Sequence, residues 1–261
     1  MGNLRPVTLI TGASAGIGAE LARTFARNGR ELVLIARRET ELAALADEIA
    51  RSGKPRPIAL ALDLTQADAA ARIAEALAAH GAEPEFVVNN AGFGLIGRGA
   101  ELDRARQLAM VDLNVRAVTE LSLAFLDCLI RRRGGLMNVA SLAGFMPGPG
   151  MAVYYASKAY VLSFTEALHR ELAPQGVRVT ALCPGPVPTE FQARAGISDD
   201  HFPQFLARSA GRVAEEGYRG LMQGRRLVIP GTTNRVAALL PRFLPRSLVL
   251  ALTDARQKSR R

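Results

Sequence analysis

Short apolar runs alternate with helical patterns along the first 182 residues, and this alternation constrains the fold more than any other feature of the chain. The runs are apolar at successive positions, which is typical of strands buried on both faces of a sheet. We expect strands at residues 7–10, 32–36, 58–62, 86–89, 136–139 and 177–182. Strands and helices in this order predict a parallel sheet with right-handed crossovers. The expected fold is α/β, a doubly wound parallel sheet with helices on both faces.

The helical patterns end at glycine and proline stop signals. Gly53 and Pro55 follow one pattern, and Gly81 and Pro84 follow the next. Thr65 stands where a side-chain cap is expected for the helix that begins at residue 66. The expected helices are residues 19–28, 39–51, 66–79, 103–132 (as one helix or two), 151–172 and 212–223, and a last strand is expected at 227–229.

The chain shows no internal repeat, no low-complexity linker and no second apolar core, so one domain over residues 1–261 is expected. After Pro184, helical periodicity disappears and Pro, Gly and Phe become frequent. We expect residues 189–215 to form a lid over the substrate and residues 232–261 to form a C-terminal extension.

Composition excludes several classes of function. Hydrophobic residues make up 49% and charged residues 22% of 261 residues, which excludes global disorder and allows a large core. The net charge is +9, but the basic residues are spread along the chain and do not alternate with aromatic residues. Nucleic-acid binding is therefore not expected.

Cysteine and histidine usage argues against disulfides and metals. Cys128 and Cys183 are too few for a disulfide scaffold or a four-cysteine zinc site. Both lie in apolar stretches, and we expect buried free thiols in a cytoplasmic protein without a secretion signal. No histidine has a second ligand at metal spacing, so no metal is expected in the chemistry.

A glycine-rich segment separates the first expected strand from the first helix. Glycines let the backbone turn sharply, and the N–H groups at the start of the helix suit a pyrophosphate. The spacing is G-x-x-x-G-x-G rather than the usual G-x-G-x-x-G. A tight turn without a ligand is the alternative, but the flanking strand and helix favour dinucleotide binding. The segment runs Thr11, Gly12, Ala13, Ser14, Ala15, Gly16, Ile17, Gly18.

The end of the second strand bears on the choice between NADH and NADPH. An acidic residue there binds the ribose 2′-hydroxyl of NAD, whereas an arginine accommodates a 2′-phosphate. Ala36 is followed by Arg37 and Arg38, and Ser14 can contact the same phosphate. NADPH is therefore favoured. The alternative is that both arginines are solvated residues that open the next helix.

Two further motifs follow the third and fourth strands. Asp63 and Leu64 come after the third, and Asn89, Asn90, Ala91 and Gly92 come after the fourth. The carboxyl ends of strands are where open α/β sheets bind ligands. Asp63 is placed to accept a hydrogen bond from an adenine amino group, or else to cap the next helix.

Tyr154 and Lys158 form a candidate proton-transfer pair. They are four residues apart, so they share one helix face. A nearby ammonium stabilises tyrosinate and lowers the phenol pKa from about 10, which makes Tyr154 a candidate general acid or base. Tyr155 lies about 100° around the helix and is expected in the cleft wall or the core. Ser141 is placed to hold a substrate carbonyl oxygen beside Tyr154.

These residues, in this order and spacing, resemble the short-chain dehydrogenase/reductase superfamily in its shorter, single-domain branch. The resemblance covers about residues 5 to 231 and implies a Rossmann-like fold. Its motifs include residues 11–18, residues 89–92, Asn114, Ser141, Tyr154 with Lys158, and Pro184 to Thr189. No departure is seen at the four catalytic positions.

The resemblance implies a role for each matching residue. Tyr154 would exchange a proton with the substrate oxygen, Ser141 would orient that oxygen, and Lys158 would lower the tyrosine pKa and hold the nicotinamide ribose. Asn114 would hold a water that links Lys158 to solvent; its alternative is an ordinary polar helix residue. The resemblance also implies that Asn90 steadies the central strand. The residues that would contact the nicotinamide are Pro184, Gly185, Val187 and Thr189.

Apolar residues gather in sequence around the expected cleft and favour a small lipophilic carbonyl or alcohol as substrate, although each could belong to the core. They are Phe93, Leu95, Leu142, Phe145, Met146, Val153, Phe191, Phe202 and Phe205. The expected activity is NADP(H)-dependent reduction of a lipophilic ketone, such as a 3-oxoacyl or steroid-like compound, or the reverse oxidation. One alternative is a catalytically silent NADP(H)-binding sensor. Another is an epimerase or a dehydratase, but such enzymes usually carry a larger second lobe, for which this chain lacks room.

Residues 239–250 are apolar with interspersed arginines. Packing on the chain itself or on a neighbouring subunit is the favoured interpretation, because the family implies a homodimer or homotetramer. A free tail and peripheral membrane contact are the less favoured alternatives, since prolines interrupt any single interfacial helix.

Overall fold

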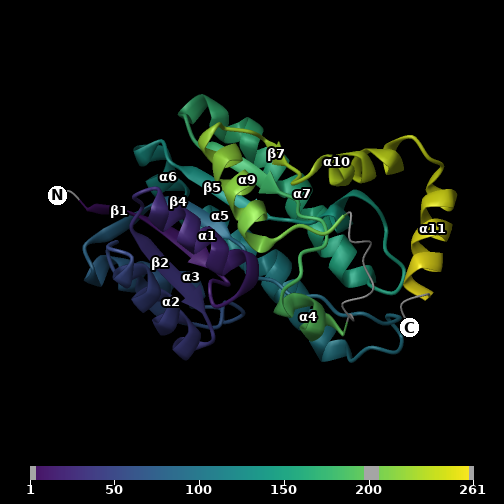
Figure 1. The fold of residues 1–261 in the computed structure, drawn as a ribbon, viewed down its shortest axis with the longest axis horizontal. Coiled ribbons are helices and arrows are strands. Elements are labelled where there is room, and N and C mark those ends of the chain that lie inside the picture. The colour runs from purple at the N-terminus through teal and green to yellow at the C-terminus, as the bar shows by residue number, and fades with distance from the viewer. Residues whose placement is uncertain (1–3, 197–205, 259–261) are drawn as a thin grey trace.

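The computed structural model describes residues 4–196 and 206–258. Their strands form one parallel sheet in the order β3-β2-β1-β4-β5-β6-β7 (Figure 1). The strands are β1 (Arg5–Thr11), β2 (Leu32–Ala36), β3 (Ile58–Ala61), β4 (Ala82–Asn89), β5 (Gly135–Val139), β6 (Arg178–Leu182) and β7 (Leu227–Val228). The order reverses between β1 and β4, which creates the crevice where doubly wound sheets bind ligands. The predicted fold class is confirmed.

Two apolar clusters cover the two faces of the sheet, because neighbouring strand residues point to opposite faces. Ile10 packs on one face with α1 (Gly16–Arg27), α2 (Glu39–Arg51) and α9 (Ala210–Met222). Leu9 packs on the other face with a second group of helices. That group is α3 (Ala69–Ala79), α5 (Val118–Ala124), α6 (Leu126–Arg132) and α7 (Ala152–Leu172).

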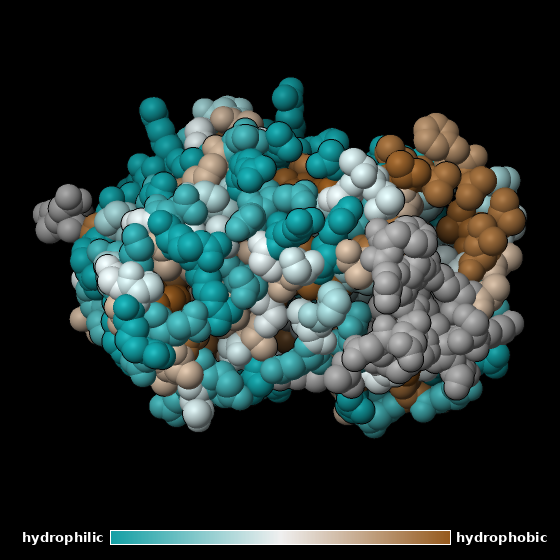
Figure 2. Space-filling model, viewed as in Figure 1, coloured by the Kyte–Doolittle hydropathy of each residue, from teal (hydrophilic) through white to brown (hydrophobic). Residues whose placement is uncertain are grey.

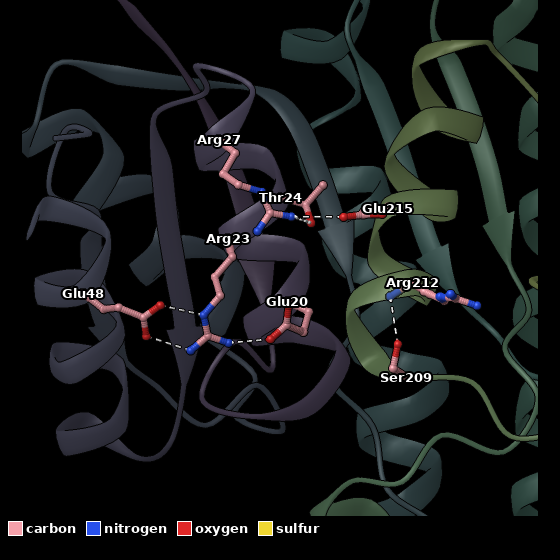
Figure 3. A network of polar contacts seen from close by, with 8 residues as sticks. All are labelled: Glu20, Arg23, Thr24, Arg27, Glu48, Ser209, Arg212 and Glu215. Atoms are coloured by element: carbon pink, nitrogen blue, oxygen red, sulfur yellow. Dashed lines mark hydrogen bonds and ion pairs between the residues drawn. The ribbon is translucent and has the colours of Figure 1, made fainter. Parts of the chain in front are cut away.

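Ion pairs join the three helices of the first face. Arg23 of α1 makes a bidentate contact with Glu48 of α2, at 2.7 and 2.8 Å, and a third contact with Glu20 (Figure 3). Arg27 lies 3.6 Å from Glu215 of α9. Each exposed pair is worth at most about 1 kcal/mol, so the network fixes the direction of α1 more than it stabilises the fold. The direction of α1 matters because its N-terminus opens into the crevice.

The sequence expectations fail at several places. The strand expected at residues 86–89 already begins at Ala82. The helix expected from residue 66 begins at Ala69, because Thr65 hydrogen-bonds Asp63 instead of capping the helix. The stretch 103–132 is not one or two helices but α4 (Arg104–Val111), a π-helical turn η1 (Asp112–Ala117), α5 and α6. Cys183 is buried as expected, but Cys128 is only half-buried.

The remaining elements surround the crevice and the C-terminus. The expected lid contains α8 (Glu190–Ala195) and the start of α9, and Phe202 and Phe205 lie outside the described residues. The last part of the chain forms α10 (Thr232–Leu239), the short turn η5 (Leu240–Arg242) and α11 (Arg246–Lys258). In Figure 1, α11 lies at the opposite end of the molecule from β1. Within the described residues, no helix is both long and apolar enough to cross a bilayer.

Candidate active site

A cavity of about 950 Å³ opens at the carboxyl ends of the central strands. It brings together nearly all of the residues singled out from the sequence, although these come from segments far apart in the chain. Of the residues assigned to catalysis or cofactor binding, Gly18 and Asn114 do not line the cavity, although both lie beside residues that do. The residues that do line it are Gly12, Ser14, Gly16, Ile17, Arg37, Arg38, Asp63, Leu64, Asn90, Ala91, Gly92, Ser141, Tyr154, Lys158, Pro184, Gly185, Val187 and Thr189. Of the apolar residues expected around the cleft, Leu95, Phe145 and Val153 do not line it either.

The glycine-rich turn is so tightly packed that side chains have no room there. Gly12 has a φ of 65°, and a Cβ on it would lie 2.8 Å from the Ala91 Cα atom. A Cβ on Gly18 would lie 2.2 Å from the Gly12 carbonyl oxygen. Glycine is therefore required for α1 to begin directly against the end of β1.

Hydrogen bonds between Thr11, at the end of β1, and Asn90, directly after the neighbouring strand β4, hold the turn in place. The Asn90 side-chain amide donates to the carbonyl oxygens of Thr11 and Gly12, at 2.9 and 3.2 Å. The Thr11 hydroxyl accepts from the backbone N–H groups of Asn90 and Ala91, both at 3.0 Å. These bonds clamp β1 to β4 at the point where the strand order reverses.

The N-terminus of α1 points its free N–H groups into the cavity region. Among the described residues, the N-cap Ala15 provides no side-chain cap and the first turn contains no acidic residue. The positive end of the helix dipole is therefore available to an anion. The glycine cradle and the uncapped helix together fit a pyrophosphate.

Arg38 stands at the end of β2 beside the glycine-rich turn. Its guanidinium donates to the Ser14 hydroxyl at 3.2 Å and to the Ser14 carbonyl oxygen at 3.2 Å. It also pairs with Glu41 and with Glu190 of α8, both at 3.1 Å. Arg37 is exposed, and its charge acts on Asp63. The two arginines thus give this end of the cavity a positive charge that carboxylates partly offset.

Asp63 closes a local turn and does not cap a helix. Its Oδ1 accepts from the Thr65 backbone N–H at 2.9 Å and from the Thr65 hydroxyl at 2.8 Å. Burial acts to raise the pKa of Asp63, but these hydrogen bonds and the charge of Arg37 outweigh it and lower the pKa. Asp63 is therefore an ionised acceptor on the cavity wall.

Tyr154 and Ser141 meet inside the cavity. Burial raises the pKa of Tyr154 to about 12, although a side-chain hydrogen bond with Ser141 works in the opposite direction. The sequence expectation was a pKa lowered by Lys158, and this structure does not show it. The physical reason is that desolvation of the phenolate dominates, since the lysine amine lies 6.0 Å from the centre of the tyrosine ring.

Lys158 is buried below the tyrosine and points to the end of β5. Its Nζ donates to the Val139 carbonyl oxygen at 2.8 Å. Burial lowers the pKa of Lys158 to about 8. Burying a cation away from water with one backbone acceptor costs folding free energy. Such a cost points to a chemical role for Lys158.

Asn114 lies in the π-helical turn η1 and is fully buried. Its side-chain amide makes two hydrogen bonds to the Phe93 backbone: Oδ1 accepts from the N–H at 3.1 Å, and Nδ2 donates to the carbonyl oxygen at 2.9 Å. It also donates to the Ser157 hydroxyl at 3.1 Å. A Cβ on Gly92 would lie 2.9 Å from the Asn114 Oδ1 and 3.5 Å from the Lys158 Nζ, so the two groups flank the same glycine.

Comparison with known proteins decides the family. A family model described as short chain dehydrogenase matches residues 6–199, nearly three quarters of the chain. The chain belongs to the short-chain dehydrogenase family. It is an oxidoreductase with the Rossmann-like sheet of that family.

Individual relatives agree with this assignment. The dehydrogenase is 38% identical to sulfoacetaldehyde reductase 2 of Chromohalobacter salexigens over 71% of this chain and 74% of that protein. A short-chain dehydrogenase from Sphingobium yanoikuyae, solved in complex with NADPH, is 33% identical, with a TM-score of 0.80 over 91% and 93% of the two chains. The bulky-bulky ketone specific alcohol dehydrogenase of Comamonas testosteroni is 28% identical, with a TM-score of 0.76 over 93% of each chain.

Aromatic side chains of the dehydrogenase surround Tyr154. The ring of Phe191, from α8, lies 5.6 Å from the Tyr154 ring, and Tyr155 meets it edge-on at 6.2 Å. Tyr155 packs against Gly148, where a Cβ would lie 2.3 Å from its ring. Tyr155 is thus part of the cavity wall, in agreement with the sequence expectation.

Several residues of this site, Arg106 and Met151 among them, were not found from the sequence, and three others show why. Glu190 reaches back from α8 to Arg38. Asn234 of α10 is fully buried, donates to the carbonyl oxygens of Pro230 and Leu206 at 2.8 and 3.2 Å, and packs against Gly185. Thr253 of α11 lines the cavity. All three depend on contacts between distant segments, for which a single sequence carries no signal.

Among the described residues, no group of three His, Cys, Asp or Glu is arranged to hold a metal ion. His169, which the sequence places inside a helix, uses its Nδ1 in a 2.8 Å contact with the Val179 carbonyl oxygen. His201 lies outside the described residues.

Proposed function

We propose that this dehydrogenase reduces a lipophilic ketone to a secondary alcohol with NADPH, or catalyses the reverse reaction. One observation carries the proposal: a single cavity joins the glycine cradle at the start of α1 to the Tyr154 and Ser141 pair. A dinucleotide in the cradle and a carbonyl beside the tyrosine would therefore share one enclosed space. The location is the cytoplasm, where the free thiols expected from the sequence persist.

The residues of the cavity fit a nicotinamide dinucleotide. A Cβ on Gly12 or Gly18 would clash with neighbouring backbone, so these glycines let the turn fold tightly at the start of α1, and the uncapped α1 N-terminus suits the pyrophosphate. Asp63 offers an ionised acceptor near the adenine end, while Asn90 keeps the turn rigid. The same wall continues through the backbone of residues 184–189 toward Tyr154.

NADPH is the preferred cofactor on electrostatic grounds. Ala36 ends β2 where an acidic residue would bind a ribose 2′-hydroxyl, so no carboxylate at that position repels a 2′-phosphate. Arg38, held against Ser14, and the exposed Arg37 provide the positive charge that this phosphate needs. Solved relatives include one with NADPH and others with NAD or NADH, so the choice rests on these residues of this chain.

Tyr154 acts as the general acid in the reductive direction. The bound cofactor supplies the hydride, and the protein supplies position and a proton. With its pKa near 12 the phenol is fully protonated at neutral pH, so it is ready to donate to the developing alkoxide. Ser141 donates a second hydrogen bond to the same oxygen and fixes the substrate carbonyl against the phenol.

Lys158 and Asn114 support the tyrosine from behind. Once proton donation leaves a tyrosinate, the Lys158 cation, 6.0 Å from the centre of that ring, would stabilise it, and Lys158 would also contact the nicotinamide ribose of a bound cofactor. Asn114 fixes the backbone at Phe93, and its side chain and Lys158 both lie beside Gly92, where a water held between them would return the proton from solvent. The π-helical turn, a feature frequent at functional sites, places this amide.

The substrate end of the cavity is apolar. Phe93, Leu142, Met146, Met151 and Phe191 line it near Tyr154. Such a wall favours a bulky hydrophobic carbonyl compound, of which 3-oxoacyl and steroid-like ketones are examples. The relative that is specific for bulky-bulky ketones supports this substrate class.

A short anionic aldehyde is a second candidate substrate. Arg106, on α4, lines the cavity and is the specific observation that favours it. An arginine there could hold a sulfonate or carboxylate, and a relative 38% identical is a sulfoacetaldehyde reductase.

The dehydrogenase is also inferred to form a homodimer or homotetramer. Leu108 and Val111 of α4 and Tyr160 of α7 are exposed large apolar residues on elements that contact one another. Burial of these side chains against a second copy would remove them from water.

A titration of the purified protein with NADPH and NADH, followed by cofactor fluorescence, tests the proposal first. Tighter binding of NADPH, together with its oxidation by bulky ketones, is the expected result. Turnover of sulfonated aldehydes alone would select the second substrate class. Tight NADPH binding without turnover of any carbonyl compound would show a silent sensor, and binding of neither cofactor would overturn the proposal.

A further inference from the structure

The C-terminal extension exposes a cluster of large apolar side chains, here called the C-terminal patch. Figure 2 shows brown residues gathered where α10 and α11 lie, whereas much of the rest of that face is teal. Phe243, which is 81% exposed, stands in the turn between the two helices. The members of the patch are Val236, Leu239, Leu240, Phe243, Leu248, Leu250 and Leu252.

The extension is anchored by other residues and leaves the patch uncovered. Asn234 and Ala238 are buried on one side of α10, and Val249 is buried in the part of α11 whose side chains are described. The sequence analysis favoured packing of this segment on the chain itself or on a neighbouring subunit. Packing on the chain itself explains the buried residues of the two helices but not the exposed patch. Contiguous exposed apolar surface of this kind marks an interaction site.

The charge of the extension indicates the kind of partner. Residues 231–261 contain seven Arg or Lys residues and one acidic residue, a net charge of +6 out of the +9 of the whole chain. Arg235, Arg242 and Arg246 are exposed among the apolar residues. An apolar surface interspersed with cations complements a surface that is anionic outside and apolar beneath, which is a lipid bilayer with anionic headgroups.

A second copy of the chain is a poorer occupant of this patch. A two-fold contact would bring the arginine-rich surfaces of both copies into one interface, and like charges at an interface disfavour association. The exposed apolar residues of α4 and α7 provide a different surface for self-association.

We propose that the turn between α10 and α11 docks peripherally on an anionic lipid surface. The turn contains Pro241 and Pro245 and presents Phe243 and Leu240 for shallow insertion, with Arg242 and Arg246 beside them for the headgroups. The same two helices contribute Ala237 and Thr253 to the cavity wall. Docking therefore brings the lipid surface next to the cavity.

Vesicle co-sedimentation of the full chain tests the proposal. One set of vesicles is phosphatidylcholine alone, and the other is an equal mixture with phosphatidylglycerol. We expect at least about tenfold more protein on the mixed vesicles and its release at molar salt, because headgroup attraction is screened. The assay needs neither cofactor nor substrate, so its outcome is independent of the proposed function.

Matched variants distinguish vesicle binding through the C-terminal patch from non-specific adsorption to vesicles. Phe243→Ser is expected to reduce vesicle binding about tenfold, whereas Leu4→Ser, at another exposed apolar position, leaves it unchanged. Arg242→Glu with Arg246→Glu is expected to abolish the preference for mixed vesicles. Arg104→Glu with Arg170→Glu makes the same change of net charge elsewhere and should retain the preference. The charge variants keep the test valid if Phe243→Ser fails to fold.

Wild-type protein that stays in the supernatant with both kinds of vesicle would overturn the proposal. If light scattering then showed a smaller assembly for Phe243→Ser, the patch would be an interface between copies. Equal loss of vesicle binding in the matched control variants would overturn it as well.

Discussion

Arg38 forms a 3.1 Å ion pair with Glu190, so the end of β2 is joined directly to the first turn of α8. The same guanidinium is the group that we assign to the 2′-phosphate of NADPH. A phosphate at this place and the Glu190 carboxylate therefore compete for one cation. The structure thus links cofactor choice to the segment that also places Phe191 against Tyr154.

Glu190→Gln should tighten NADPH binding by about two- to fivefold, because an exposed ion pair that must be broken is worth up to about 1 kcal/mol. NADH affinity should not change, since NADH has no phosphate at that position. Fluorescence titration of both cofactors checks this. Glu39→Gln, at an exposed carboxylate nearby, is the control; weaker NADPH binding in Glu190→Gln alone would contradict the competition.

Replacement of Arg37 and Arg38 by Ala should weaken NADPH binding by about 10- to 100-fold, the usual worth of charge-assisted hydrogen bonds. NADH binding should fall less than about threefold, because the negative charges of NADH are on the pyrophosphate, which we assign to the α1 N-terminus and not to these arginines. Kd values from the same titration provide the measurement. Equal losses for the two cofactors would remove the assignment of the 2′-phosphate.

Gly18→Ala should destabilise the protein by about 3 kcal/mol or more, because its Cβ would lie 2.2 Å from the Gly12 carbonyl oxygen and the backbone would have to move. Urea unfolding gives the free energy directly. Gly99→Ala is the matched control, since a Cβ there meets only the Gln107 side chain at 3.8 Å. Equal stability of the two variants would show that the turn is not tightly packed.

Lys158→Met should abolish turnover and yet stabilise the fold. Burial lowers the pKa of Lys158 from 10.5 to about 8, so keeping the charge costs about 3 kcal/mol at neutral pH. Loss of the hydrogen bond to Val139 offsets about 1 kcal/mol, which leaves a net gain of about 2 kcal/mol.

The pH dependence of that gain gives a second check. Because the folded pKa lies below the unfolded one, wild-type stability from this group is complete above pH 10.5 and is lost as pH falls through 8. The advantage of Lys158→Met should therefore be largest below pH 8 and fall by about 3 kcal/mol by pH 10.5, where the lost hydrogen bond leaves the variant about 1 kcal/mol less stable than wild type. Urea unfolding of both proteins at several pH values measures it, and a constant difference would contradict the low pKa of Lys158.

Much of the fold was predictable from the sequence because apolar periodicity and stop signals are local. The strand 32–36 and the helix 39–51 have the same bounds in the structure as in the sequence analysis. The start of α3 was not predictable, because Asp63 competes for the Thr65 hydroxyl through a turn that propensity does not reveal. The π-helical turn at Asn114 likewise depends on tertiary contacts with Phe93 and Ser157.

The candidate site likewise has residues that could be predicted from the sequence and features that could not. Gly12, Tyr154 and Lys158 stand at fixed spacings, so they could be named from the sequence, and the structure brings them to one cavity. The pKa of Tyr154 could not be predicted, because its sign depends on how much burial outweighs a charge held 6.0 Å from the ring centre. Glu190 could not be named either, because it is far from Arg38 in sequence.

The central claim is that Tyr154 donates the proton during carbonyl reduction. The most direct measurement is the rate of NADPH oxidation by a bulky ketone in wild type, Tyr154→Phe and Tyr155→Phe, with NADPH affinity measured in parallel. Tyr154→Phe should lower kcat by about 10²- to 10⁴-fold while NADPH affinity stays within about twofold, and Tyr155→Phe should retain most activity. A Tyr154→Phe enzyme as active as wild type, or a greater loss in Tyr155→Phe, would contradict the account.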